Sequence, residues 1–287
     1  MFKKMLLCTD LSPAADAIIH CVEELKCVGM EEVILTHVIY VANTPGLEEM
    51  LIEEARPVLE RQKEALEARG VKATVEMPFG LPAHTLNETA EKHDVSAIVI
   101  GSHGKGILQA TTLGSVSSKL LHQTRRPVLL ARIALLEEGK CQAVCRKLFT
   151  RVLFPTDFSE AAERALDYLG KIALETGCPV TVLHVIEEKD EDPADAQRRE
   201  EDARFLLEAK KRRLETLGAS GVNIDLVKGK PSEEIIGRSK EGNFSIIVMG
   251  GQGKSLLKEV FLGSVANEVA RFAEVPVLFV PAPPHNE

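Results

Sequence analysis

The chain has 287 residues, of which 45% are hydrophobic and 27% are charged, and its formal net charge at pH 7 is -8. This length predicts two domains, and the negative charge argues against binding of a nucleic-acid backbone, which requires clustered Lys and Arg. Only 4% of the residues are aromatic and Trp is absent, which disfavours stacking platforms for single strands. No apolar run approaches about 18 residues and the start is too short for a secretory signal, so we expect a cytoplasmic protein without membrane contact.

The first half predicts an alternation of apolar strands and helices. Ser12 followed by Pro13 is a strong helix start, because Ser is a good N-cap and Pro suits the first helical position. The long charged helix that follows the second strand contains Pro57, where we expect a kink. The predicted strands are 5–9, 33–38, 72–76, 97–100 and 128–131, and the predicted helices are 13–28, 48–69, 81–93 and 115–123.

The second half repeats the first. LLCTDLSPAA at 6–15 matches LFPTDFSEAA at 153–162, and RPVLLA at 126–131 matches VPVLFV at 275–280. Such collinear similarity indicates a duplicated domain. The predicted strands of the second copy are 151–156, 180–185, 222–227, 245–249 and 277–280, with helices between them.

Apolar strands that alternate with helices predict a parallel sheet with helices on both faces. We therefore expect two doubly wound α/β domains, at 1–134 and 148–287, joined by a linker at 135–147. The helix at 195–217 is rich in both signs of charge, so we interpret it as a solvated face and not as a nucleic-acid patch. Its expected core stripe includes Phe205, Leu206, Leu214 and Leu217.

The six cysteines are scattered, and most lie in segments that are predicted to be buried. Free cysteine behaves as a small hydrophobe, so we do not expect a disulfide framework. Cys141 and Cys145 are four residues apart in the connection and would share a face if it were helical, which suits a metal or redox pair. No His or Cys at a ligand spacing accompanies them, and buried thiols remain the favoured interpretation.

A glycine pattern follows the fourth strand of each copy. Gly101 and Gly104 precede Gly114-Ser115 in the first copy, and Gly250 and Gly253 precede Gly263-Ser264 in the second. Ligands of open α/β sheets bind beyond the carboxyl ends of the strands, and the N-H groups of a helix start can hold phosphate. The alternative is that these glycines serve only turns and a helix cap. Their presence in both copies, each between a strand and a helix, favours a phosphate site.

Two better-known phosphate motifs are not supported. GGQGKS at 250–255 resembles the end of a P-loop, but that motif requires a glycine where this chain has Val248. A dinucleotide fingerprint fails as well, because Gly104 and Gly106 are followed by Gln109.

The pattern G-x2-G-x9-G-[ST], present twice, resembles that of the universal stress proteins in their tandem, ATP-binding form. The resemblance implies Rossmann-like domains similar to the adenine nucleotide alpha hydrolases, with strand order 3-2-1-4-5. It also implies that the fifth strands, 128–131 and 277–280, pair with one another as a pseudo-twofold tandem. A homodimer is a further option.

Carried over to this sequence, the family's nucleotide contacts fall on two matching sets of residues. The first set is Asp10, Val38, Ile100, Gly101, Gly104, Gly114, Ser115, Val116 and Ser117. The second set is Pro155, Asp157, Val185, Met249, Gly250, Gly253, Gly263, Ser264 and Val265. Lys105 and Lys254 follow the second glycine of each pattern and could reach phosphate oxygens, although a solvated Lys is an equal alternative.

Two departures from the family pattern predict unequal affinities. Cys8 stands where the family often has Pro, and Ala266 stands where the first copy has the hydroxyl of Ser117. We expect the first site to be the better one, because it has more hydroxyls.

The resemblance implies a stress-response regulator that binds ATP, ADP or AMP, with Mg as an optional companion of the phosphates. Hydrolysis requires an oriented water and usually a protein-held metal, for which the sequence offers only Asp10 and Asp157. Local hydrogen bonding is at least as good an explanation of these two carboxylates. A slow ATPase and a scaffold with vestigial sites remain the alternatives. The downstream protein partner is not predicted.

Overall fold

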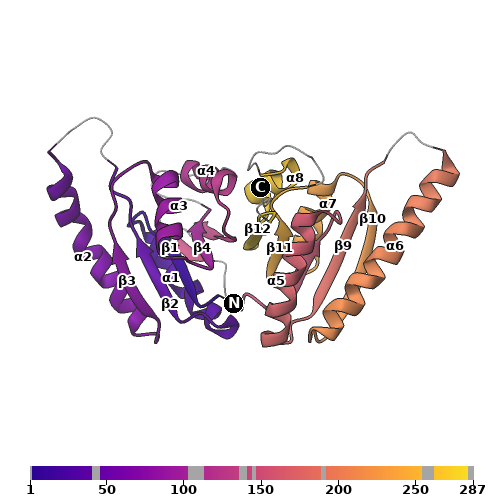
Figure 1. Cartoon of the computed structure of the whole chain (residues 1–287), viewed down its shortest axis with the longest axis horizontal. Coiled ribbons are helices and arrows are strands. Elements are labelled where there is room, and N and C mark those ends of the chain that lie inside the picture. Colours follow the sequence, from indigo (N-terminus) through magenta and orange to yellow (C-terminus); the bar gives the residue numbers. More distant parts are fainter. Residues whose placement is uncertain are drawn as a thin grey trace. The chain divides into compact units, whose positions relative to one another are not determined.

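The computed structural model of the chain describes residues 2–40, 46–102, 113–135, 141–143, 147–188, 192–253 and 262–283. The chain divides into two compact units, Met1–Arg146 and Lys147–Glu287. Figure 1 shows that each unit contains strands flanked by helices.

In the first unit, five parallel strands lie in the order β3-β2-β1-β4-β5. The strands are β1 (Lys4–Cys8), β2 (Glu32–Thr36), β3 (Lys72–Glu76), β4 (Ala97–Gly101) and β5 (Val128–Ala131). The helices are α1 (Pro13–Glu24), the 3-10 turn η1 (Leu25–Val28), α2 (Glu48–Glu67), α3 (Pro82–Lys92) and α4 (Ser115–Gln123). Pro57 lies inside α2, which continues through it.

The second unit repeats this arrangement, with the order β10-β9-β8-β11-β12. Its strands are β8 (Val152–Pro155), β9 (Val180–Ile186), β10 (Val222–Lys228), β11 (Ile246–Gly250) and β12 (Val277–Val280). Its helices are α5 (Glu160–Thr176), α6 (Pro193–Thr216), α7 (Pro231–Glu241) and α8 (Ser264–Phe272). The predicted fold class, two doubly wound parallel sheets of order 3-2-1-4-5, is confirmed within each unit.

The central strands form the core because helices cover both of their faces. Every residue of β4 and β8 is buried, as expected for strands that are apolar throughout. Ser12 and Ser159 cap the helices that follow the first strand of each unit, accepting hydrogen bonds from Ala15 N and Ala162 N. These caps fix where α1 and α5 begin, directly beside the strand ends.

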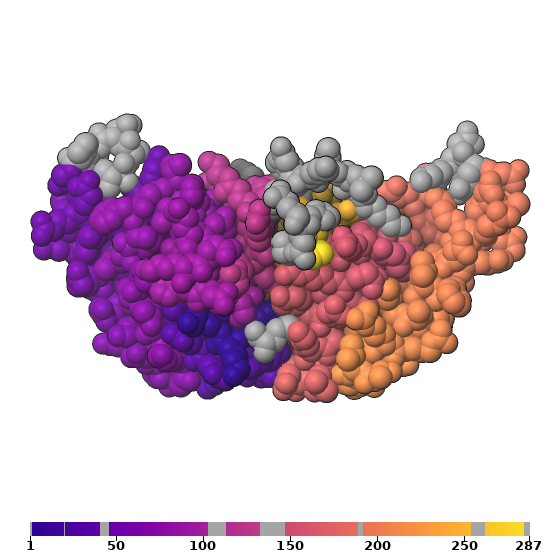
Figure 2. All heavy atoms as spheres, in the orientation of Figure 1, coloured from indigo at the N-terminus to yellow at the C-terminus, as the bar shows by residue number. Residues whose placement is uncertain are grey.

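The predicted core stripe of α6 was partly wrong. Leu214 is buried, as expected, but its buried companions are Ala203 and Leu207, whereas Phe205 is 71% exposed and Leu206 is 38% exposed. The helix is rotated so that Leu207 faces the sheet, and the hydrophobic pattern alone did not fix that rotation because both neighbours are apolar. Figure 2 shows the outer side of α6, in salmon to orange, on the surface.

The connection between the sheets contains structure that the sequence did not predict. Ile133–Leu135 (β6) and Cys141–Ala143 (β7) pair antiparallel. Cys141 therefore lies in a strand and not in the helix that a shared face with Cys145 would require. Cys145 lies outside the described residues. Cys21 of α1 is disulfide-bonded, contrary to the expectation of free thiols, whereas Cys8, Cys27 and Cys178 are free.

No helix in the part of the chain that the structure describes combines the length and apolarity needed to cross a bilayer.

Candidate functional site

A tight turn joins β1 to α1 in the first unit. The Asp10 Oδ1 atom accepts hydrogen bonds from the Ser12 backbone N-H (3.0 Å) and the Ser12 hydroxyl (2.5 Å). The Leu11 backbone N-H donates to the Thr9 hydroxyl oxygen at 3.1 Å, and Leu11 has a φ of 64°. A non-glycine residue in this left-handed region is uncommon and is held there by its surroundings. The turn therefore fixes the Asp10 carboxylate at the strand end.

The second unit has the same turn between β8 and α5. Asp157 Oδ1 accepts from the Ser159 N-H at 3.0 Å, the Phe158 N-H donates to Thr156 Oγ1 at 3.1 Å, and Phe158 has a φ of 61°. One oxygen of each carboxylate thus serves the turn itself. The local hydrogen bonding expected at Asp10 and Asp157 is present in both units.

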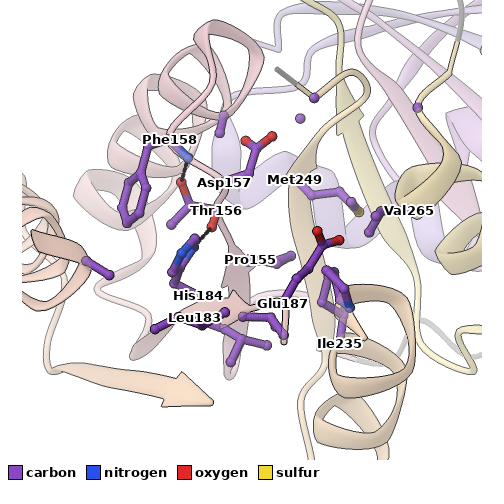
Figure 3. Close-up of a pocket in the computed structure, with 18 of the residues that line it drawn as sticks. Pro155, Thr156, Asp157, Phe158, Leu183, His184, Glu187, Ile235, Met249 and Val265 are labelled. Atoms are coloured by element: carbon purple, nitrogen blue, oxygen red, sulfur yellow. Dashed lines mark hydrogen bonds between the residues drawn. The ribbon is translucent and has the colours of Figure 1, made fainter. Parts of the chain in front are cut away.

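A histidine at the carboxyl end of the second strand holds each turn. His37 Nδ1 lies 2.9 Å from the Thr9 carbonyl oxygen, and His184 Nδ1 lies 2.7 Å from the Thr156 carbonyl oxygen. Because a carbonyl oxygen only accepts, Nδ1 carries the proton in both rings. Figure 3 shows this bond at His184, whose ring also lies 4.5 Å from that of Phe158, centroid to centroid. Each histidine therefore ties the second strand to the aspartate turn.

The glycines of the second unit have distinct physical reasons. A Cβ on Gly250 would lie 2.9 Å from the backbone of Ala161 and Ala162, so this glycine lets α5 pack on the end of β11. A Cβ on Gly253 would lie 3.1 Å from Asp157 Oδ2, so that glycine faces the carboxylate of the turn. Gly250 is thus required by the packing of α5, which neither a turn nor a helix cap explains, and Gly253 lies close to the Asp157 carboxylate.

In each unit the start of the helix after the fourth strand lines the cavity at the strand ends. This helix is α4 in the first unit and α8 in the second. Gly114 and Gly263 are their N-caps, and neither provides a side-chain cap hydrogen bond. The first backbone N-H groups of a helix lack intrahelical partners and favour an anion. In the first unit the Ser117 hydroxyl is buried and donates to the Gly101 carbonyl oxygen at 2.7 Å. That bond removes the ground for ranking the first site higher by its hydroxyls.

A cavity of about 260 Å³ lies at the strand ends of the first unit. The structure brings eight predicted residues together around it: Asp10, Val38, Ile100, Gly101, Gly114, Ser115, Val116 and Ser117. Two more predicted residues, Gly104 and Lys105, lie outside the described residues. Cys8 also lines the cavity, and burial raises the pKa of its thiol, so Cys8 contributes a neutral, largely apolar wall.

A larger cavity, of about 750 Å³, lies at the strand ends of the second unit. All nine described residues of the second predicted set line it: Pro155, Asp157, Val185, Met249, Gly250, Gly253, Gly263, Ser264 and Val265. Lys254 lies outside the described residues. Figure 3 shows Asp157 in the upper part of the view, Glu187 and Ile235 in the lower part, and Met249 between them.

Sequence reasoning missed several residues that line the cavities. His37 and His184 recur at matching positions of the two copies, and this repetition is the signal that could have identified them. The α6 residues Arg199, Asp202, Ala203 and Leu206 line the second cavity. Leu206 was expected in the core stripe of this helix, and no local pattern distinguishes Arg199 and Asp202 from the many other charged residues around them. Among the described residues, no group of three or more His, Cys, Asp or Glu side chains could hold a metal ion.

The chain is similar to several known proteins. Universal stress protein MJ0577 of Methanocaldococcus jannaschii is 32% identical over 155 residues, which cover 46% of this chain and 95% of the relative. A universal stress protein of Mycolicibacterium smegmatis is 27% identical over 237 residues, covering 79% and 77% of the two chains. The crystal structure of a universal stress protein from Archaeoglobus fulgidus matches with a TM-score of 0.74 and 29% identity, over 99% of this chain and all of that chain.

The model of the universal stress protein family matches residues 1–132 and, a second time, residues 148–281. The two matches coincide with the two sheets and include both glycine patterns. The chain therefore belongs to the universal stress protein family and carries its domain twice.

Proposed function

We propose that the protein is a regulatory protein of the stress response that binds an adenine nucleotide in the cavity of each unit. The observation that carries this proposal is the arrangement around each cavity. A helix start without a side-chain cap and an aspartate turn both line each cavity, together with apolar side chains. This combination suits a ligand with an anionic end, a hydroxylated middle and a flat apolar end.

In the second unit, different residues would contact the phosphates, the sugar and the base of the nucleotide. The backbone N-H groups of Ser264 and Val265, at the start of α8, would hold the phosphates. The Asp157 carboxylate would accept hydrogen bonds from sugar hydroxyls. Val185 and Met249 would pack against the base. In the first unit the corresponding residues are Ser115, Val116, Asp10, Val38 and Ile100.

We expect the second site to bind the nucleotide with the higher affinity. Its cavity of about 750 Å³ lies within the range of small-molecule pockets, whereas the 260 Å³ of the first lies just below it. The added hydroxyl of the first site is used within the protein, by the bond from Ser117 to Gly101. The sites would take ATP, ADP or AMP, and any Mg would arrive with the phosphates.

Pairing of the fifth strands β5 and β12, which the family resemblance implies, stays a prediction. Hydrolysis gains no support from the turns, since one oxygen of each of Asp10 and Asp157 accepts hydrogen bonds from the backbone that follows it.

The proposal is tested by the small molecules that the purified protein carries. We expect heat to release adenine nucleotide, which anion-exchange chromatography separates and quantifies. The double variant Gly114→Val, Gly263→Val should release none while keeping the helical circular dichroism of the unaltered chain. A wild-type protein that releases no nucleotide and gives no heat with ATP in calorimetry would overturn the proposal.

A further inference from the structure

The second cavity extends along the sheet edge from one helix start to the side of another helix. Its lining begins at Gly250 and Ser264, crosses the aspartate turn after β8, and continues past β9 to α6. In the sheet order, β8 lies between β11 and β9. If the phosphates sit at the start of α8, the opposite end of a nucleotide, its base, reaches β9 and α6.

One face of α6 closes that end of the cavity. Arg199, Asp202, Ala203 and Leu206 line it, and their spacing of three, four and seven residues places them on one side of the helix. An Arg199 Nη2-H group donates to the Glu187 carbonyl oxygen at 3.1 Å, which anchors the guanidinium to the end of β9. The Asp202 side chain is one turn further along. A cation and a carboxylate thus stand beside the apolar wall of Leu206.

The first unit lacks this wall. Three buried residues align α2 with α6 at a constant offset, since Ala55, Leu59 and Leu66 match Ala203, Leu207 and Leu214. At this offset Arg199 replaces Leu51 and Asp202 replaces Glu54. Among the described residues of α2, none lines the first cavity.

We propose that α6 reads the edge of the base in the second unit, with Arg199 donating and Asp202 accepting hydrogen bonds. This inference rests on the proposed nucleotide site. The edge of adenine presents an amino group, which donates, beside a ring nitrogen, which accepts. A carboxylate paired with a guanidinium is the matching set, because the first only accepts and the second only donates. Hypoxanthine carries a carbonyl and a protonated ring nitrogen at these positions, so a fixed Asp-Arg order rejects it. The second unit is thus selective for the base, and the first unit is not.

The test compares ATP with inosine triphosphate, which differ only at that edge of the base. Calorimetry is run on the full-length Gly114→Val chain, so that the second site reports. We expect ATP to bind about a hundredfold more tightly than inosine triphosphate, as for the loss of two hydrogen bonds to charged groups. Arg199→Ala and Asp202→Ala should each lower this ratio to about tenfold, and the double variant should bring it close to one. Glu54→Ala, the matched change on α2, should leave it unchanged.

Circular dichroism of each variant serves as the control for folding. A ratio that stays the same in both α6 variants, with ATP still bound, would overturn the base-reading role while leaving the proposed function intact. If the unaltered chain binds neither nucleotide, the proposed function fails and this inference fails with it.

Discussion

The two cavities differ although the framework around them is the same. Each unit has a Thr-Asp turn with a left-handed residue, a histidine that holds it and an uncapped helix start. Yet the cavity volumes are about 260 and 750 Å³. Among the described residues, the helix after the second strand lines only the second cavity. The duplicated units thus share the part that would hold phosphate and differ where a base would lie.

The largest expected effect is on stability, and it concerns Gly250, against which α5 packs. Gly250→Ala would place a Cβ 2.9 Å from the backbone of Ala161, whereas a Cβ at Gly251 meets nothing closer than 3.7 Å. We expect Gly250→Ala to lower the free energy of unfolding of the second unit by about 1–3 kcal/mol, because the backbone of α5 must move. Denaturant unfolding measures this, with Gly251→Ala as the matched control. Equal stability of the two variants would refute the packing role of Gly250.

The next effect concerns the hydroxyl by which the first site differs from the second. Ser117→Ala removes a buried hydrogen bond to the Gly101 carbonyl oxygen and should destabilise the first unit by about 1 kcal/mol. ATP affinity of that site should change less than twofold, since the hydroxyl is turned to the protein. The reverse change, Ala266→Ser, should not tighten the second site. A large loss of affinity in Ser117→Ala would instead restore the ranking expected from the sequence.

The smallest effect is a pH dependence in the first unit. Burial raises the pKa of Glu76, but hydrogen bonds from Lys92 (3.1 Å) and His93 (2.7 Å) lower it by more, so the net shift is downward. The stabilisation is therefore present above the ordinary Glu pKa of 4.5 and is lost as the pH falls through the lowered value. Glu76→Gln should cost about 0.5 kcal/mol at pH 7 and nothing at pH 2.

The exposed Glu31, which lies 3.9 Å from Lys3, provides the control, and Glu31→Gln should have no measurable effect at either pH. Thermal unfolding at the two pH values measures both variants. A cost of Glu76→Gln that does not diminish in acid would contradict this account.

The sequence predicted the fold because each level of evidence agreed. Ser12 with Pro13 marks a helix start, and β4 is apolar throughout. The second copy predicts the same order of strands and helices independently of the first. The misplaced stripe of α6 shows the limit, since Leu206 and Leu207 are equally apolar and only packing against the sheet chooses between them. The pairing of β6 with β7 was missed although Gly139 lies among the five residues between them, because each strand is only three residues long.

The candidate site was predictable where chemistry depends on the backbone. Gly253 and Gly263 were predictable because the glycine pattern recurs in both copies between a strand and a helix, and a Cβ on Gly253 would lie only 3.1 Å from Asp157 Oδ2. Arg199 and Asp202 could not be found, since their position at the cavity depends on the rotation of α6 and on the end of β9. Ser117 shows the converse, because the direction of a hydroxyl is a tertiary property that its type does not reveal.

The central claim is tested most directly by titrating ATP into the full-length chain and its two helix-start variants in a calorimeter. The account predicts two binding events of different affinity, the tighter abolished by Gly263→Val and the weaker by Gly114→Val. A tighter event that survives Gly263→Val and disappears in Gly114→Val would contradict the ranking of the sites, and an absence of binding heat in the unaltered chain would contradict the claim itself.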